Sequence, residues 1–174
     1  MSDQSLEVWK NWKQAQQKYD YFLIGLAAAL FAYVGGNYSP EPFSISQNSF
    51  ELLALISLFI SISSGLFRLE NDLSLQATKI EQLNAKNILG TLNKASTFLG
   101  KVVNEDTGRE MNKSELTEKK EILEVFISKS DKGLRLISNR CMWQFTIRNY
   151  SLFLGFLFLV VSKLIGLLVI SQAT

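Results

Sequence analysis

Three stretches of this 174-residue chain carry almost no charge, and each is long enough to cross a lipid bilayer. They are residues 21–38, 50–67 and 149–170, and their only charged side chains are Glu51 and Lys163. A helix needs about 20 apolar residues, with a range of about 17–25, to cross the hydrocarbon core. Buried helices of soluble proteins usually keep a polar face, and strands of membrane barrels alternate polar with apolar residues. These stretches do neither, so the sequence predicts an all-α integral membrane protein with three transmembrane helices.

A cleaved signal peptide is the alternative interpretation of the first stretch. Twenty residues of mixed charge precede that stretch, and its apolar part is longer than the hydrophobic region of a signal peptide. No polar mature segment begins after its alanines. We therefore expect residues 21–38 to be retained as a membrane span.

The distribution of lysine and arginine predicts how the chain is threaded. The loop 39–49 contains neither residue, whereas residues 68–148 hold fourteen of the eighteen and residues 1–20 hold three. Loops rich in these cations stay in the cytoplasm. The prediction is a multi-pass membrane protein with its N-terminus and residues 68–148 in the cytoplasm. The loop 39–49 and residues 171–174 then lie outside.

Two cytoplasmic parts are predicted to be helical. Residues 1–20 read as an amphipathic helix, because Leu6, Trp9, Trp12 and Tyr19 recur at helical spacing. This aromatic stripe either lies in the inner membrane interface or packs on other cytoplasmic helices of the chain.

Residues 68–148 read as a long antiparallel helical hairpin with a tip loop at 104–114, where the apolar periodicity stops. In its first helix, apolar residues at heptad spacing form a coiled-coil-like seam that polar residues interrupt. The members of that seam are Leu66, Leu69, Leu73, Ile80 and Leu83, with Gln76 and Asn87 between them. The returning helix has an apolar face formed by Leu116, Leu123, Phe126 or Ile127, Leu134, Ile137 and Cys141.

The composition excludes several kinds of catalytic and metal site. The chain has no histidine and only one cysteine, Cys141, so histidine-based acid–base chemistry, histidine zinc sites and internal disulfides are ruled out. No pair of carboxylates and no nucleophile with a neighbouring base stands out. We therefore expect no enzymatic activity, no cofactor and no metal site.

Small residues recur in each span, four apart in the first and second, and such residues let helices approach closely. The candidate helix-packing residues are Ala28, Ala32 and Gly36 in the first span, Gly65 in the second, and Gly155 and Gly166 in the third. The second span adds Ser57, Ser61 and Ser64, whose hydroxyls can bond across a contact. These faces either pack the three helices of one chain together or meet other copies, with the serines lining a polar path.

Lys163 is the one cation within a predicted span, and Glu51 begins another span at the same predicted membrane face. Because unpaired charges in hydrocarbon are costly, we predict that Lys163 points towards Glu51 or towards the face of Ser57 and Ser61. Snorkelling to the outer interface is the alternative. If the chain forms a pore, Lys163 would line its outer half and favour anions.

A second group of cations is expected close to the inner leaflet. The group contains Lys129, Lys132, Arg135, Arg140 and Arg148. Each could attract anionic lipid headgroups, and the alternative is that these cations only set the orientation of the chain.

The arrangement of spans 21–38 and 50–67, followed by helices after Arg68, resembles the SLATT group of small bacterial membrane effectors from nucleotide-signalling and antiphage defence systems. The third span departs from that pattern. The resemblance implies an effector that forms a pore or channel and disrupts the membrane. With it we expect a protein of the bacterial inner membrane, in contact with membrane lipids and without a nucleic-acid partner. The small-residue faces, Lys163 and the interrupted seam lead us to expect a homo-oligomer. The alternative is a non-conducting scaffold whose hairpin recruits a cytosolic protein.

Overall fold

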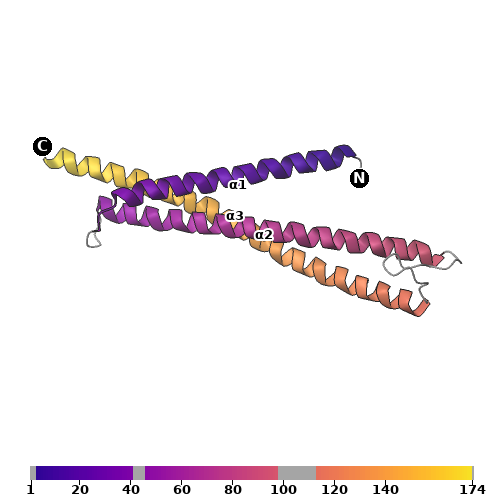
Figure 1. Cartoon of the computed structure of the whole chain (residues 1–174). Coiled ribbons are helices and arrows are strands. Elements are labelled where there is room, and N and C mark those ends of the chain that lie inside the picture. Colours follow the sequence, from indigo (N-terminus) through magenta and orange to yellow (C-terminus); the bar gives the residue numbers. More distant parts are fainter. Residues whose placement is uncertain (1–2, 41–45, 98–112, 174) are drawn as a thin grey trace. The chain divides into compact units, whose positions relative to one another are not determined.

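The chain forms three long helices (Figure 1). The structure, a computed structural model, describes residues 3–40, 46–97 and 113–173. Its helices are α1 (Asp3–Asn37), α2 (Gln47–Thr97) and α3 (Lys113–Ala173). All regular structure in these three ranges is helical, which confirms the predicted all-α class. Each helix contains a segment long and apolar enough to cross a membrane.

The helices extend well beyond the predicted spans. They have 35, 51 and 61 residues, and none is interrupted where an apolar stretch meets a polar one. A helix bonds its own backbone groups internally, so it need not end where the surroundings change from lipid to water. The predicted tip loop 104–114 lies outside the described residues, apart from Lys113 and Ser114, which begin α3.

The chain divides into two compact units. The three-helix unit consists of Met1–Glu70 and Cys141–Thr174, and the two-helix unit is Asn71–Arg140. The three predicted spans all belong to the three-helix unit. The two-helix unit falls within residues 68–148, the segment in which the basic residues concentrate.

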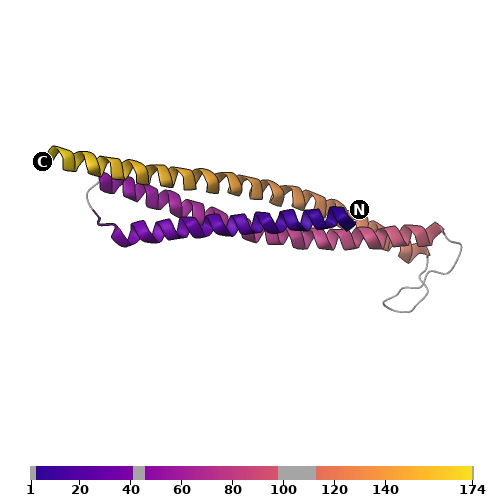
Figure 2. The same cartoon turned by 90° about the horizontal axis from the view of Figure 1, so that it is seen from above.

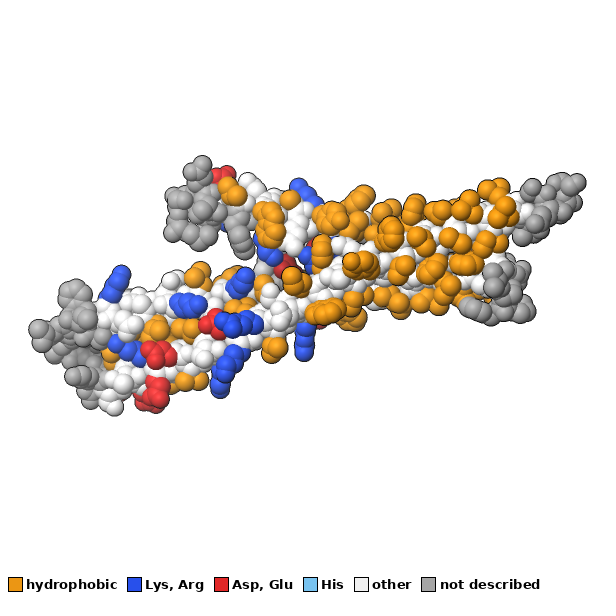
Figure 3. All heavy atoms as spheres, turned by 180° about the vertical axis from the view of Figure 1, so that it is seen from behind, with side chains coloured by type: hydrophobic (Ala, Val, Ile, Leu, Met, Phe, Trp, Pro, Cys, Tyr) orange, Lys and Arg blue, Asp and Glu red, His pale blue; other side chains and the backbone are white. Residues whose placement is uncertain are grey.

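The three-helix unit packs through small side chains, and its large apolar side chains point outwards. Its helices lie side by side in two perpendicular views (Figure 1 and Figure 2). Ala27, Ala54, Leu58 and Ser162 are fully or almost fully buried, and a Cβ on Gly155 would lie only 3.0 Å from Leu58. On the face seen in Figure 3, apolar side chains cover the part of this unit that contains the predicted spans. This distribution suits helices in lipid, where close packing rather than the hydrophobic effect holds them together.

In the two-helix unit, α2 and α3 pack through a face that is not the predicted seam of α2. The buried residues of α2 are Leu75, Gln82, Ala85 and Leu92. Gln82 Nε2 donates to Asp131 Oδ1 at 2.5 Å and to the Ile127 carbonyl at 3.4 Å. The predicted seam residues Leu73, Ile80 and Leu83 are instead 59–63% exposed.

The predicted apolar face of α3 is the one that packs. Leu116 and Leu134 are buried, and Leu123, Ile127 and Ile137 are half-buried. Ile127, rather than the exposed Phe126, belongs to this face. The side chains with the clearest heptad spacing in α2 are thus left largely exposed by the part of the chain that the structure describes.

Close packing of α2 predicts the effect of adding one methyl group. A Cβ on Gly65 would lie 2.6 Å from Ile24 Cγ1 and 3.3 Å from Arg148 Cδ. We expect Gly65→Ala to lower the stability of the full chain by about 1–3 kcal/mol, because an overpacked interior forces its neighbours apart. Thermal unfolding in a mild detergent measures this loss.

Gly25→Ala is the matched control, because a Cβ there would have nothing within 4 Å. It should leave the unfolding temperature unchanged or raise it slightly, since alanine favours the helix more than glycine. Equal unfolding temperatures for the two variants would contradict the packing described for Gly65.

Candidate functional site

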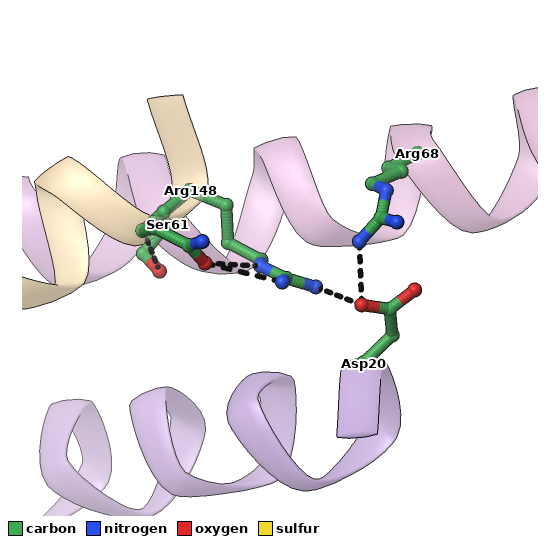
Figure 4. A network of polar contacts seen from close by, with 5 residues as sticks. Asp20, Ser61, Arg68 and Arg148 are labelled. Atoms are coloured by element: carbon green, nitrogen blue, oxygen red, sulfur yellow. Dashed lines mark hydrogen bonds and ion pairs between the residues drawn. The ribbon is translucent and has the colours of Figure 1, made fainter. Parts of the chain in front are cut away.

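A buried group of three charged residues joins all three helices in the three-helix unit. This charge cluster consists of Asp20 from α1, Arg68 from α2 and Arg148 from α3 (Figure 4). Arg68 Nη1 lies 2.5 Å from Asp20 Oδ1, and Arg148 Nη1 lies 2.6 Å from the same oxygen. Each of the three residues directly adjoins one end of a predicted span. One carboxylate therefore fixes the ends of three spans at the same level.

The side chains of the charge cluster are shielded from water, and their charges do not sum to zero. The exposed fractions of its side chains are 1% for Arg148, 7% for Asp20 and 9% for Arg68. Two guanidinium groups and one carboxylate leave one positive charge in excess. Removing ions from water is costly unless hydrogen bonds and opposite charges replace the water.

Aromatic rings and an amide replace part of the water that would otherwise surround the two arginines. The Phe145 ring centre lies 4.6 Å from Arg68 Cζ and 5.2 Å from Arg148 Cζ, and the Tyr19 ring centre lies 5.9 Å from Arg148 Cζ. The negative face of an aromatic ring attracts such cations. Asn149 Oδ1 also accepts hydrogen bonds from Arg148 Nε at 3.2 Å and from Nη2 at 3.1 Å.

The small residues of α2 make room for Arg148. Gly65 faces the Arg148 side chain, and Ser61 Oγ donates to the Arg148 carbonyl at 3.0 Å. Ser61 is almost fully buried, so within one chain its hydroxyl joins α2 to α3. Ser57 and Ser64 lie on the same helix and are half-buried.

A second polar contact joins α2 and α3 in the same unit. Lys163 Nζ lies 3.1 Å from Glu51 Oε1, so of the two partners predicted for Lys163 it is Glu51, and not the face of Ser57 and Ser61, that is confirmed. Gln47 Nε2, at 3.1 Å, and Ser162 Oγ, at 3.2 Å, donate to the same oxygen. The Lys163 side chain is 63% exposed along its length while its ammonium is bonded to Glu51.

These two polar contacts are separated by roughly the thickness of a hydrocarbon core. Glu51 and Arg68 are seventeen residues apart on α2, and Arg148 and Lys163 are fifteen apart on α3. At about 1.5 Å per residue, the separations are about 26 Å and about 22 Å. The core of a bilayer is about 30 Å thick. The three-helix unit therefore presents an apolar layer of membrane dimensions between two polar ends.

The other predicted helix-packing residues divide into two groups. Gly155 packs on Leu58, and Gly166 packs on Gln47. Ala28, Ala32 and Gly36 of α1 are exposed instead, and a Cβ on Gly36 would have nothing within 4 Å. This small-residue face of α1 makes no contact with the rest of the described chain that requires small side chains.

The predicted group of headgroup-binding cations also divides. Lys129, Lys132, Arg135 and Arg140 are exposed in the two-helix unit. Arg148 does not belong with them, because its side chain is buried and bonded to Asp20 and Asn149. The sequence placed Arg148 close to the membrane boundary but did not show that an acidic residue of α1 would cover it.

No catalytic arrangement emerges from these contacts. Among residues 3–40, 46–97 and 113–173, no group of three or more histidine, cysteine, aspartate or glutamate side chains could hold a metal ion. Comparison of the chain with protein-family models, with curated proteins and with solved structures found no match. The arrangement can fix helices in register and maintain buried positive charge at one end of the unit.

The charge cluster was not predicted from the sequence, although a signal for it was present. Asp20 precedes the first span, Arg68 follows the second and Arg148 precedes the third. In a chain that crosses a membrane three times, these positions all lie at the same membrane face. Opposite charges at one level, each next to an apolar helix, indicate an ion cluster.

The single carboxylate predicts an unequal response to substitution. Asp20→Asn leaves two buried guanidinium groups without a counter-ion, and we expect a loss of about 3–5 kcal/mol in stability. Arg68→Met leaves one arginine paired with one aspartate, so the loss should be smaller. Thermal unfolding of the full chain in a mild detergent ranks the two variants.

The exposed Glu81 supplies the control, because Glu81→Gln changes the net charge as Asp20→Asn does and should leave stability unaltered. If Arg68→Met proved as damaging as Asp20→Asn, the excess positive charge would not be the determining feature.

Proposed function

We propose that the chain is a multi-pass protein of the bacterial inner membrane that assembles with copies of itself and forms or gates a pore. In this proposal α1, α2 and α3 each cross the membrane once. Residues 68–148 form a cytoplasmic antiparallel hairpin that drives or senses assembly. The role is that of a membrane effector similar to the SLATT group, without enzymatic activity.

The observation that carries the proposal is the exposed apolar seam of α2. Leu73, Ile80 and Leu83 follow heptad spacing and lie 59–63% exposed in the two-helix unit. The sequence of that unit contains twelve basic and ten acidic residues, so it belongs in water rather than in lipid. Covering one leucine or isoleucine side chain contributes about 1.5–3 kcal/mol. The same seam of a second copy, paired in parallel, has the right spacing to cover it.

The small-residue face of α1 supports contacts between copies within the membrane. Ala28, Ala32 and Gly36 lie four residues apart and are exposed along the same side of the helix. Small residues at this spacing let helices from different chains approach closely in lipid. Two separate surfaces are therefore suited to meet other copies, one in each unit.

Disulfide trapping tests the pairing of seams. In a Cys141→Ser background, Leu83→Cys places a thiol at a seam position, and mild oxidation in membranes should yield a cross-linked dimer as the main product. The control, Ser74→Cys, is exposed but lies off the seam, so it should remain mostly monomeric. A monomeric Leu83→Cys protein, or equal cross-linking of both variants, would contradict the proposed assembly.

Ion flux tests the pore itself. Liposomes containing the full chain should conduct ions. Lys163→Glu should shift the reversal potential in a potassium chloride gradient towards cations, since two carboxylates then replace the neutral Glu51–Lys163 pair in each copy. The exposed Lys79→Glu is the control for a distant charge change and should leave selectivity unaltered.

Two results would count against the pore. The absence of any flux would favour the non-conducting scaffold, whose hairpin recruits a cytosolic protein. Conduction with an unchanged reversal potential in Lys163→Glu would exclude Lys163 from the conducting path.

A further inference from the structure

A groove of about 360 Å³ runs between α1 and α3 within the three-helix unit. Leu23, Leu26 and Leu30 form its α1 side, where they share one helix face. Phe153 and Phe156 lie on the α3 side. The groove lies within the apolar layer that separates the charge cluster from the Glu51–Lys163 contact, so its surroundings in a membrane are lipid chains.

The length of the groove corresponds to one leaflet. Tyr19, at its polar end, and Leu30, at its apolar end, are eleven residues apart on α1, or about 16 Å at 1.5 Å per residue. Half of a hydrocarbon core of about 30 Å is about 15 Å. The α1 side of the groove therefore matches the length of an acyl chain in the leaflet on the side of the charge cluster.

The polar end of the groove is connected to the charge cluster. Its two polar lining residues are Tyr19 and Asn149, and both contact Arg148. Asn149 Oδ1 accepts two hydrogen bonds from the Arg148 guanidinium, so the Asn149 amide NH₂ is directed away from that arginine. Neither this NH₂ nor the Tyr19 hydroxyl donates a hydrogen bond within the described residues. Two neutral donors thus stand at the end of an apolar groove, beside a buried cluster with one excess positive charge.

We propose that this groove binds one anionic phospholipid per chain. One acyl chain lies along Leu23, Leu26 and Leu30, and the phosphate accepts hydrogen bonds from Asn149 and from the Tyr19 hydroxyl. The negative charge of the lipid balances the excess positive charge of Asp20, Arg68 and Arg148, which a neutral lipid or an apolar helix would leave uncompensated. This inference rests on the proposal that the chain spans a membrane, and it does not depend on assembly or conduction.

Native mass spectrometry of the full chain in a mild detergent tests the site. Phosphatidylglycerol and phosphatidylcholine with identical acyl chains are added at equal concentrations, and the retained lipid is counted per chain. We expect one retained phosphatidylglycerol, favoured over phosphatidylcholine about fivefold, the factor that corresponds to about 1 kcal/mol. Equal retention of the two lipids would overturn the proposal.

Two substitutions locate the binding. Leu26→Trp fills the groove and should abolish the preference, whereas Leu164→Trp, an exposed position of α3 outside the groove, should preserve it. Tyr19→Phe removes one donor but keeps the ring beside Arg148, so it should reduce the preference without altering the unfolding temperature. If Leu26→Trp fails to fold, Phe156→Trp fills the groove from α3 instead and should abolish the preference for phosphatidylglycerol in the same way.

Other outcomes identify another occupant and reject the lipid. Retention of phosphatidylglycerol by both groove-filling variants would place it elsewhere. A lower oligomeric mass in Leu26→Trp, with lipid retention unaltered, would mean that the groove holds a helix of a second copy. Cross-linking through Leu83→Cys and ion flux in liposomes are measured separately, so failure of the lipid site and failure of the proposed pore give different results.

Discussion

The carboxylate of Asp20, shared by the guanidinium groups of Arg68 and Arg148, is the contact on which the arrangement of the three-helix unit depends. Apolar helices in lipid gain little from the hydrophobic effect, so they can slide or rotate against one another at small cost. A buried ion pair has one acceptable geometry, because any slip leaves a charge uncompensated. The charge cluster therefore sets the register of all three helices.

The rest of the packing in this unit follows from that register. With Arg148 beside Asp20, Gly65 and Ser61 of α2 lie against the side chain and carbonyl of Arg148. About two turns of α3 further on, Gly155 meets Leu58. At the far end, Lys163 and Ser162 reach Glu51. Because small residues lie at each of these contacts, one register of the three helices gives both close packing and paired charges.

The sequence was most informative where a residue type was rare in its surroundings. Long uncharged stretches identified the three candidate spans, because a helix needs about 20 apolar residues to cross a bilayer. Glu51 was predicted as one of two partners for Lys163, because each is the only charge in its span. The α1 face of Ala28, Ala32 and Gly36 was equally evident, but spacing alone could not distinguish contacts within one chain from contacts between copies.

The sequence was least informative where a polar residue lies among the apolar ones that pack. The face of α2 that contacts α3 contains Gln82, whose amide bonds to Asp131 and to a backbone carbonyl, and no hydrophobic pattern selects such a residue. The more regular seam of Leu73, Ile80 and Leu83 was left exposed. Periodicity shows that an apolar face exists, whereas the identity of its partner depends on hydrogen bonds and charges distant in sequence.

A double-mutant cycle on Asp20 and Arg148 tests the central role of the charge cluster most directly. Asp20→Asn, Arg148→Gln and the double variant are unfolded thermally in the same detergent as the unsubstituted chain. If the two side chains set the register together, the sum of the stability losses of the two single variants will exceed the loss of the double variant by about 1–3 kcal/mol. Losses that add to within about 0.5 kcal/mol would show that the two residues act independently, and would contradict the account.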